Sequence, residues 1–331
     1  MKSKKLISIL ALVLGASILT ACSDAGKKTA FSGYWYQNAA TPEVGVQRTD
    51  ETLVYDVSFT AGSGLKSAGY ELDYNGEYTT TLSIQTVEGK TVYHYDTKLA
   101  VNVTYIYQGK TETKQDEVTS HVEFETATNG LRPIRSEKTI KNHSPKNSAS
   151  SLESCYSVVN YTVTTEYNSS ASGGSCTVVN LDAKENGSKK SSFSVKDEYT
   201  CLDNEQLFFA LRGVNPSVSS SPSFSVYDAF KRSVLTVKAS YGSKVEGKEF
   251  KFNKYNAAES AFKENKANID YYPVSVAIDA DMPGTTQTVW VAATKNSQSN
   301  DNRNVILRME NPLYYSLGTL TYTLKSAQFS N

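Results

Sequence analysis

The side chains best able to do chemistry in this sequence are three histidines and four cysteines. His94, His121 and His143 could act as general bases, and the cysteines could be acylated, form disulfides or bind metal. The chain contains no Gly-x-Ser-x-Gly, HExxH, phosphate-binding loop or dinucleotide-binding glycine pattern, and no CxxC or Cys/His zinc spacing. We therefore predict no catalytic residues, no metal site and no cofactor.

His94 and His121 fall on neighbouring predicted strands, where a histidine is more often a surface side chain than a general base. Asp279 and Asp281 flank a turn and lack the further spaced oxygen ligands that a calcium loop needs. Both sets are interpreted as structural.

The chemistry expected of Cys22 is acylation. Lys2, Lys4 and Lys5 precede an apolar run from Leu6 to about Leu19, and the run is shorter than the roughly 20 residues of a membrane span. Leu19-Thr20-Ala21-Cys22 resembles a bacterial lipobox. The resemblance implies cleavage before Cys22 and attachment of diacylglycerol and palmitate to it; an ordinary secretory signal is the alternative. A lipid anchor would hold the protein on the extracytoplasmic side of the cell membrane or the outer membrane.

Three segments are expected: a lipoprotein signal peptide (1–21), a lipidated N-terminus and tether (22–32) and a single large antiparallel β domain (33–331). Removal of residues 1–21 takes away three lysines and no acid, which leaves a net charge of −3. Without a basic block, the chain offers no electrostatic surface for nucleic acid. The expected partners are the membrane and a lipid or another envelope protein.

The exported chain would contain three other cysteines. Because three is an odd number, at least one thiol must stay unpaired or pair with another molecule. Cys176 and Cys201 could face each other if the strands around them form a hairpin across Asn186-Gly187-Ser188, and a disulfide between them is one possibility. In that case Cys155 would stay unpaired.

Most of the chain alternates apolar and polar residues with the period of a strand. The segments 52–59, 78–85, 91–107, 156–163 and 318–325 are examples, and short turns separate them, which is typical of an antiparallel meander. One segment differs: Asp203 to Gly213 has an N-cap, a capping-box Gln206 and a terminating glycine, and predicts a helix of about nine residues. Residues 142–151 are expected to form an exposed loop, and 256–263 a short surface helix or an insertion.

The order of four motifs resembles an uncharacterised family of bacterial periplasmic and lipid-anchored proteins related to the outer-membrane lipoprotein carriers. The motifs are Thr128–Ile134, Asp203–Arg212, Val289-Trp290-Val291 and Gly318–Leu324. The resemblance implies a mainly β fold, a curved antiparallel sheet forming an open half-barrel with one to three short helices on its concave side. Longer polar loops and the inserted segment 253–267 depart from that family.

Related carriers hold acyl chains in the concave side, which implies candidate ligand-binding residues here. Trp290, Phe208, Phe209 and Leu211 could line such a cavity, or could fill an ordinary core. Arg132 and Arg212 could bind a phosphate or carboxylate head group. Alternatively, Arg212 balances the helix dipole and Arg132 forms a salt bridge at the end of a strand.

Two non-catalytic functions follow. The first is binding or carriage of a hydrophobic ligand in the concave sheet, and the alternative is a structural or interaction lipoprotein that binds an envelope protein or glycan through its sheet surface. An open apolar volume of several hundred Å3 would favour the first, and a filled core would favour the second.

Overall fold

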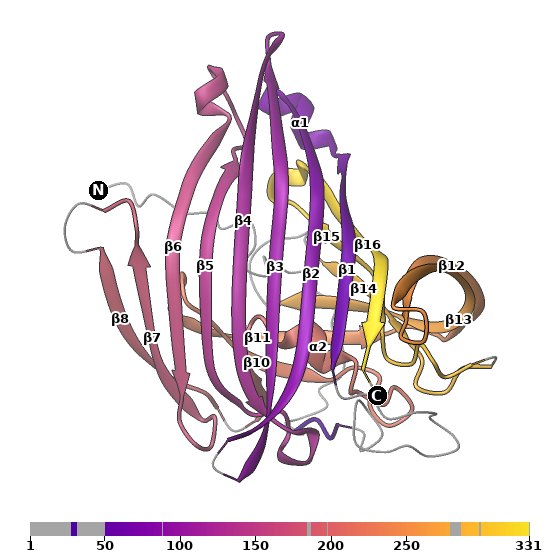
Figure 1. The fold of residues 1–331 in the computed structure, drawn as a ribbon. Helices are drawn as coiled ribbons and strands as arrows, with labels where there is room; N and C mark the ends of the chain where they lie inside the picture. Colours follow the sequence, from indigo (N-terminus) through magenta and orange to yellow (C-terminus); the bar gives the residue numbers. More distant parts are fainter. Residues whose placement is uncertain are drawn as a thin grey trace.

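The computed structural model describes residues 28–31, 50–87, 89–183, 187–196, 198–278, 286–297 and 299–330. The leader, Cys22 and the turn around Asp281 lie outside these residues. Sixteen strands form one sheet, and two short α-helices and three 3-10 turns connect or cover them (Figure 1).

The strands follow one another along the chain with short connections. They are β1 (Glu51–Ala61), β2 (Glu71–Val87), β3 (Lys90–Tyr107), β4 (Lys110–Glu125), β5 (Pro133–Pro145), β6 (Tyr156–Tyr167), β7 (Gly173–Asn180), β8 (Ser188–Ser194), β9 (Thr200–Leu202), β10 (Ser223–Asp228), β11 (Ser233–Tyr241), β12 (Val245–Asn256), β13 (Ala261–Ile278), β14 (Gln287–Ala292), β15 (Ile306–Pro312) and β16 (Gly318–Phe329). The helices are α1 (Ser63–Ala68) and α2 (Leu207–Leu211), and the 3-10 turns are η1 (Ala127–Asn129), η2 (Leu152–Ser154) and η3 (Tyr314–Ser316).

The sheet is largely antiparallel, and the prediction of a mainly β, curved open sheet with few helices is confirmed. Its strand order is β8-β7-β6-β5-β4-β3-β2-β1-β16-β15-β14-β13-β11-β10-β9, with β12 paired to β13 and β16. Two pairings, β9 with β10 and β12 with β16, are parallel, so the sheet is mixed. The long neighbouring strands β2 to β6 form the tall front wall in Figure 1, and β10, β11, β13 and β14 cross behind it.

The alternating pattern of the sequence decides which face of each strand is buried. In β3, Tyr93, Tyr95 and Leu99 point into the ring and are at most 3% exposed. Asp96 and Lys98 alternate with this set and are exposed. The same alternation continues in β1 and β4. Paired strands place their apolar residues on the same face of the sheet, so these residues together line the interior of the ring.

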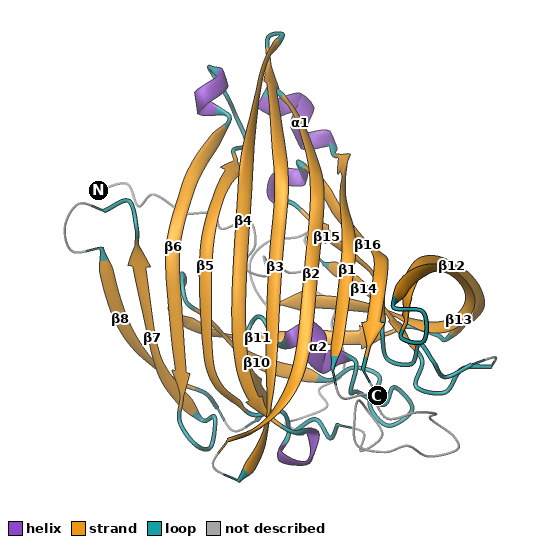
Figure 2. Cartoon of the chain, viewed as in Figure 1, coloured by secondary structure: helices purple, strands orange, loops and turns teal. Residues whose placement is uncertain are grey.

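The helix predicted around residue 207 lies in that interior. Gln206 Oε1 accepts a hydrogen bond from the Asp203 backbone N–H at 3.1 Å, and Asp203 Oδ1 accepts one from the Glu205 N–H at 2.9 Å. These reciprocal bonds form a turn before the helix, so α2 itself has five residues instead of about nine. Figure 2 shows α2 inside the curved sheet.

The two ends of the sheet meet through side chains. Phe193 on β8 stacks on Tyr227 on β10 with ring centroids 4.1 Å apart, and Ser191 Oγ lies 2.8 Å from the Tyr227 hydroxyl. Among the described strands, no backbone ladder joins β8 to β9, β10 or β11. The sheet is therefore a partial ring closed by a side-chain seam.

The helix considered for 256–263 and the full extent of the loop predicted for 142–151 were wrong. Residues 256–263 form the turn and first residues of the β12–β13 hairpin, not a helix, and Tyr255 pairs with Phe262 across it. Residues 142–145 belong to β5, where Asn142 and Ser144 are buried, so the exposed loop begins only after Pro145.

Candidate functional site

Among the described residues, α2 occupies the interior of the ring and packs against the strands around it. Phe209 is fully buried, with its ring centroid 5.1 Å from Tyr95 and 5.2 Å from Phe124. Leu211 is also fully buried, and Phe208 is partly buried against the same core. Three of the four apolar candidates thus lie together as packing residues on one short helix.

Trp290 is not part of this group. Val289 and Val291 on β14 point into the core, so Trp290 lies on the opposite face of the strand. There the Arg308 guanidinium stacks over its ring at 4.8 Å, and Tyr271 lies 5.6 Å away. The structure does not bring Trp290 together with Phe208, Phe209 and Leu211.

Arg212 forms a buried ion pair at the end of α2. Its Nη1 and Nη2 donate to the Glu51 carboxylate at 2.7 and 2.8 Å, and its Nε donates to the Asn304 carbonyl oxygen. Both side chains of the pair are 1% exposed. The guanidinium therefore holds α2 to β1 and to the segment before β15, rather than facing a pocket.

Arg132 lies in a different environment, at the start of β5. Its Nε donates to Glu125 Oε2 at 2.7 Å, which matches the salt bridge considered for it at a strand end, and its side chain remains 40% exposed. It also lines a groove of about 360 Å3. Its position thus combines the salt bridge with access to solvent.

This groove, which we call the tether groove, is polar and basic. Lys28, Arg132 and Lys196 line it, and there is no carboxylate among its described lining residues. The remaining lining residues are Thr29, Thr128, Asn129, Gly130, Ser170, Ala171, Ser172, Val195, Tyr199, Thr200 and Cys201. The Thr29 backbone N–H donates to Thr200 Oγ1 at 2.8 Å, which fixes the first described residues of the chain to the groove wall. Hydroxyls and cationic groups are suited to binding an anionic or sugar-like ligand.

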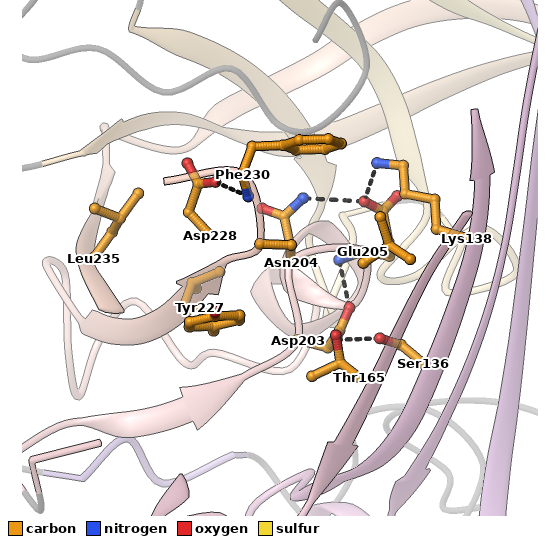
Figure 3. A pocket seen from close by; sticks show the side chains of 13 residues that line it. Ser136, Lys138, Thr165, Asp203, Asn204, Glu205, Tyr227, Asp228, Phe230 and Leu235 are labelled. Atoms are coloured by element: carbon orange, nitrogen blue, oxygen red, sulfur yellow. Dashed lines mark hydrogen bonds and ion pairs between the residues drawn. The ribbon is translucent and has the colours of Figure 1, made fainter. Parts of the chain in front are cut away.

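A second pocket lies beside the seam, between β5, β6, β10 and the start of α2 (Figure 3). Asp203 is its central acid: Oδ2 accepts hydrogen bonds from Ser136 Oγ at 2.6 Å and from the Tyr167 hydroxyl at 2.7 Å. Lys138 Nζ contacts Glu205 Oε1 at 2.5 Å, and both side chains are largely buried. These partners come from strands far apart in the chain.

Burial raises the pKa of Asp203, and the hydrogen bonds from Ser136, the Glu205 N–H and Tyr167 partly oppose that rise. Burial also raises the pKa of Tyr167. The pocket holds about 50 Å3, which is room for a few water molecules and not for an acyl chain or an organic substrate. Its carboxylate is already engaged by three donors, so its role is structural.

All three described cysteines are free thiols, so the structure does not contain the considered Cys176–Cys201 disulfide. The β7–β8 hairpin exists, but Cys201 lies beyond it on β9, which pairs with β10. Burial raises the pKa of Cys201 to about 12 and also raises that of Cys176. Both are inert core thiols at neutral pH.

The histidines lie in two places. His143 Nδ1 is 2.7 Å from Asp116 Oδ1, and His143 also donates its backbone N–H to that oxygen. Burial raises the pKa of Asp116, and the bonds from His143 oppose this. His94 and His121 lie together on the outer face of β3 and β4. The Asp203 cluster could not be found from the sequence because the partners lie 36 to 67 residues away, and no local pattern marks them.

The fold defines this protein as a mainly β protein with one large barrel-like sheet that stays open. It resembles the crystal structure of a beta-barrel-like protein with the domain of unknown function DUF1849 from Brucella abortus, with a TM-score of 0.53 and 9% sequence identity. The match covers 87% of this chain and 100% of the other. No family model and no curated protein matches the sequence. At 9% identity, the likeness shows that the two chains share a fold. The Brucella abortus protein consists of a domain of unknown function, so the match assigns no function to this chain.

Proposed function

We propose that this protein is a non-catalytic, lipid-anchored envelope protein that binds its partner on its surface. The observation that carries the proposal is the filled interior: α2 and the aromatic side chains around it occupy the concave side of the sheet. Phe209, Ala210 and Leu211 have no exposed surface. Of the two functions expected from the sequence, this favours the interaction lipoprotein over the carrier.

The anchor in this proposal is Cys22, and the sequence before it supports that role. Among the described residues, no helix has both the length and the apolar character required to cross a bilayer. Five residues lie between Cys22 and Lys28, so the two are at most about 22 Å apart when the chain is extended. Acyl chains on Cys22 would therefore keep the tether groove near the head groups.

The binding surface that we assign is the tether groove. Its three basic side chains and its many hydroxyls suit the phosphate of a lipid head group or an anionic envelope glycan. Arg132 is one of the two arginines for which head-group binding was considered from the sequence. Its guanidinium can bind a second anion, because only Nε and Nη2 donate to Glu125.

The test uses the full chain with Cys22→Ser, so that acyl chains do not dominate binding, and vesicles of phosphatidylcholine with or without phosphatidylglycerol. Lys28→Ala with Lys196→Ala should weaken binding to the anionic vesicles, by about 1 kcal/mol per lysine removed. Lys251→Ala with Lys266→Ala is the matched control, since both lysines are exposed on the β12–β13 hairpin. An equal loss in the control would show that the groove is not the binding surface.

The carrier alternative is decided on the same protein by native mass spectrometry. We expect no lipid adduct in the variant Lys28→Ala with Lys196→Ala, because α2 occupies the concave side and the groove has lost two of its cations. A stoichiometric lipid adduct that persists in this variant would overturn the surface-binding proposal and favour the carrier.

A further inference from the structure

Four potential metal-binding side chains meet on the outer face of β3 and β4. Tyr93 and Phe124 point into the core, so the neighbouring residues His94 and Glu123 point outward. The strand register places His94 opposite Glu123, and Asp96 opposite His121. Two histidines and two carboxylates thus occupy adjacent outward positions of one strand pair.

Their distances are short enough for a shared ion. One ligand atom each of His94, His121 and Glu123 lies within 4.8 Å of the other two. His121 Nε2 is 3.5 Å and His94 Nδ1 is 3.9 Å from Glu123 Oε1. Ligand atoms around a tetrahedral zinc ion are about 3.3 Å apart, as follows from Zn–N and Zn–O bonds of about 2.0–2.1 Å. Small side-chain rotations would bring the three atoms to that separation.

Asp96 prepares His121 for this role. Its Oδ1 lies 2.7 Å from His121 Nδ1, so that nitrogen carries the proton and donates it to the carboxylate. The lone pair of the neutral ring is then on Nε2, the atom that faces Glu123. A carboxylate bound to the outer nitrogen of a histidine is the usual support of a metal-ligating imidazole.

His94 lacks the hydrogen bonds that hold a purely structural histidine. Its Nε2 is buried and has no hydrogen-bond partner, and its side chain is 12% exposed. Its ring packs on that of His121 with centroids 5.3 Å apart. Its other ring nitrogen, Nδ1, is the atom that faces Glu123 and is the one available to an ion.

The surroundings leave the site negatively charged and accessible. On β5, Arg135 lies opposite Glu123 in the register, but its guanidinium contacts Glu137. Lys98, the next outward residue on β3, pairs with Glu117 at 2.9 Å. Each nearby cation thus has its own carboxylate. The strands that carry the site lie in the middle of the front wall, so the backbone positions are held by neighbours on both sides.

We propose that His94, His121 and Glu123 form a binding site for a divalent transition-metal ion, with Zn2+ as the best match and Asp96 as the positioning residue of His121. Two imidazoles exclude Mg2+ and Ca2+, which prefer all-oxygen ligands. Three protein ligands leave a fourth position for water or for a side chain of a partner.

The test is Zn2+ titration by calorimetry on the untagged full-length protein, with the absorption spectrum of bound Co2+ as the report on coordination. We expect one equivalent bound in the micromolar range or tighter, and a tetrahedral Co2+ spectrum. His94→Ala with His121→Ala should abolish both signals. Asp96→Asn should weaken binding about 10- to 100-fold, as for other outer-shell carboxylates.

Lys98→Gln with Glu117→Gln is the control, because it removes a neighbouring ion pair from the same face without removing a ligand or leaving a cation unpaired, and its affinity should stay within about twofold of the unmodified protein. Circular dichroism melts of every variant verify the fold, which the outward position of these side chains should preserve. Absence of saturable Zn2+ binding below millimolar concentration would overturn the proposal. So would equal binding in the double histidine variant.

Discussion

At the residue scale, the most informative side chain is the buried acid Asp203. The sequence predicted Asp203 as the N-cap of a helix, but it lies in the turn before α2, where its Oδ1 accepts the Glu205 N–H. The sequence did not predict that its other oxygen bonds Ser136 and Tyr167 from β5 and β6. Asp203 therefore ties the inner helix to the front wall of the sheet.

The raised pKa of Asp203 predicts a pH-dependent stability. In the window between the ordinary aspartate pKa and the raised value, the folded state binds the proton more strongly than the unfolded state. Binding of this proton stabilises the folded state fully at pH values below the ordinary aspartate pKa. This stabilisation is lost as the pH rises through the raised pKa of Asp203. Asp203→Asn removes the titration, so this variant should gain stability relative to the unmodified protein as pH rises.

Urea denaturation from pH 4 to pH 7 measures this difference in the free energy of unfolding. Glu205→Gln is a suitable comparison, since it removes a nearby, largely buried carboxylate and leaves Asp203 able to titrate. A difference between Asp203→Asn and the unmodified protein that is independent of pH would contradict the prediction.

At the element scale, α2 shows what a short helix can do inside a sheet. Its apolar pattern and its capping residues predicted a helix, but five residues cannot be stable alone. Tertiary contacts hold it: Arg212 bonds Glu51, Gln206 Nε2 donates to the Leu131 carbonyl oxygen, and the Tyr241 hydroxyl donates to the Leu211 carbonyl oxygen. The ring therefore stabilises α2, and α2 in turn occupies the interior of the ring.

Arg212→Met should destabilise the protein strongly. It leaves the Glu51 carboxylate buried without its cation, and loss of one partner of a buried pair typically costs about 3–5 kcal/mol. Arg212→Met with Glu51→Leu should recover most of that loss, because neither charge remains. Chemical denaturation of both variants gives the two free energies. A single variant that loses less than the double variant would refute this account of the pair.

The β12–β13 hairpin shows the opposite case, in which a helix-like sequence forms strands. Asn256 to Lys263 is rich in alanine, and Lys263 even pairs with Glu259 four residues before it. The cross-strand contact between Tyr255 and Phe262, with centroids 5.3 Å apart, belongs to the sheet instead. Pairing along the whole length of β12 and β13 outweighs a weak local preference.

At the scale of the whole molecule, the ring depends on its side-chain seam. Phe193 and Tyr227 stack across it, and Tyr161 packs edge-on against Phe230 with centroids 5.6 Å apart. Without backbone bonds, such a seam separates more easily than any pair of strands in the sheet. It is the place where the ring can open.

Phe193→Ala should loosen this seam without unfolding the core. We expect faster amide hydrogen exchange in β7 and β8, with unchanged protection in β2 and β3, because an aromatic pair contributes about 0.5–1.5 kcal/mol beyond the area that it buries. Phe262→Ala is the matched control, since Phe262 is 50% exposed at the hairpin tip. Equal exchange rates in β7 and β8 before and after the substitution would show that the seam does not limit opening.

The class of fold and the buried faces of its strands can be predicted from the sequence. Alternation in β1 and β3 is a local property, so it can be recognised without knowing which strands pair. The start of α2 was also recognisable, because Asp203 and Gln206 are only three residues apart. The leader before Cys22 supports the expected anchor for the same reason, since all its signals are contiguous.

Only the tertiary structure decided what the side chains do. Arg132 and Arg212 look alike in sequence, yet one lines a groove and the other pairs with Glu51 on a strand 161 residues earlier. The filled interior, the seam and the grouping of His94 with His121 depend on register and curvature. These arise from many distant contacts acting together, and no local spacing encodes them.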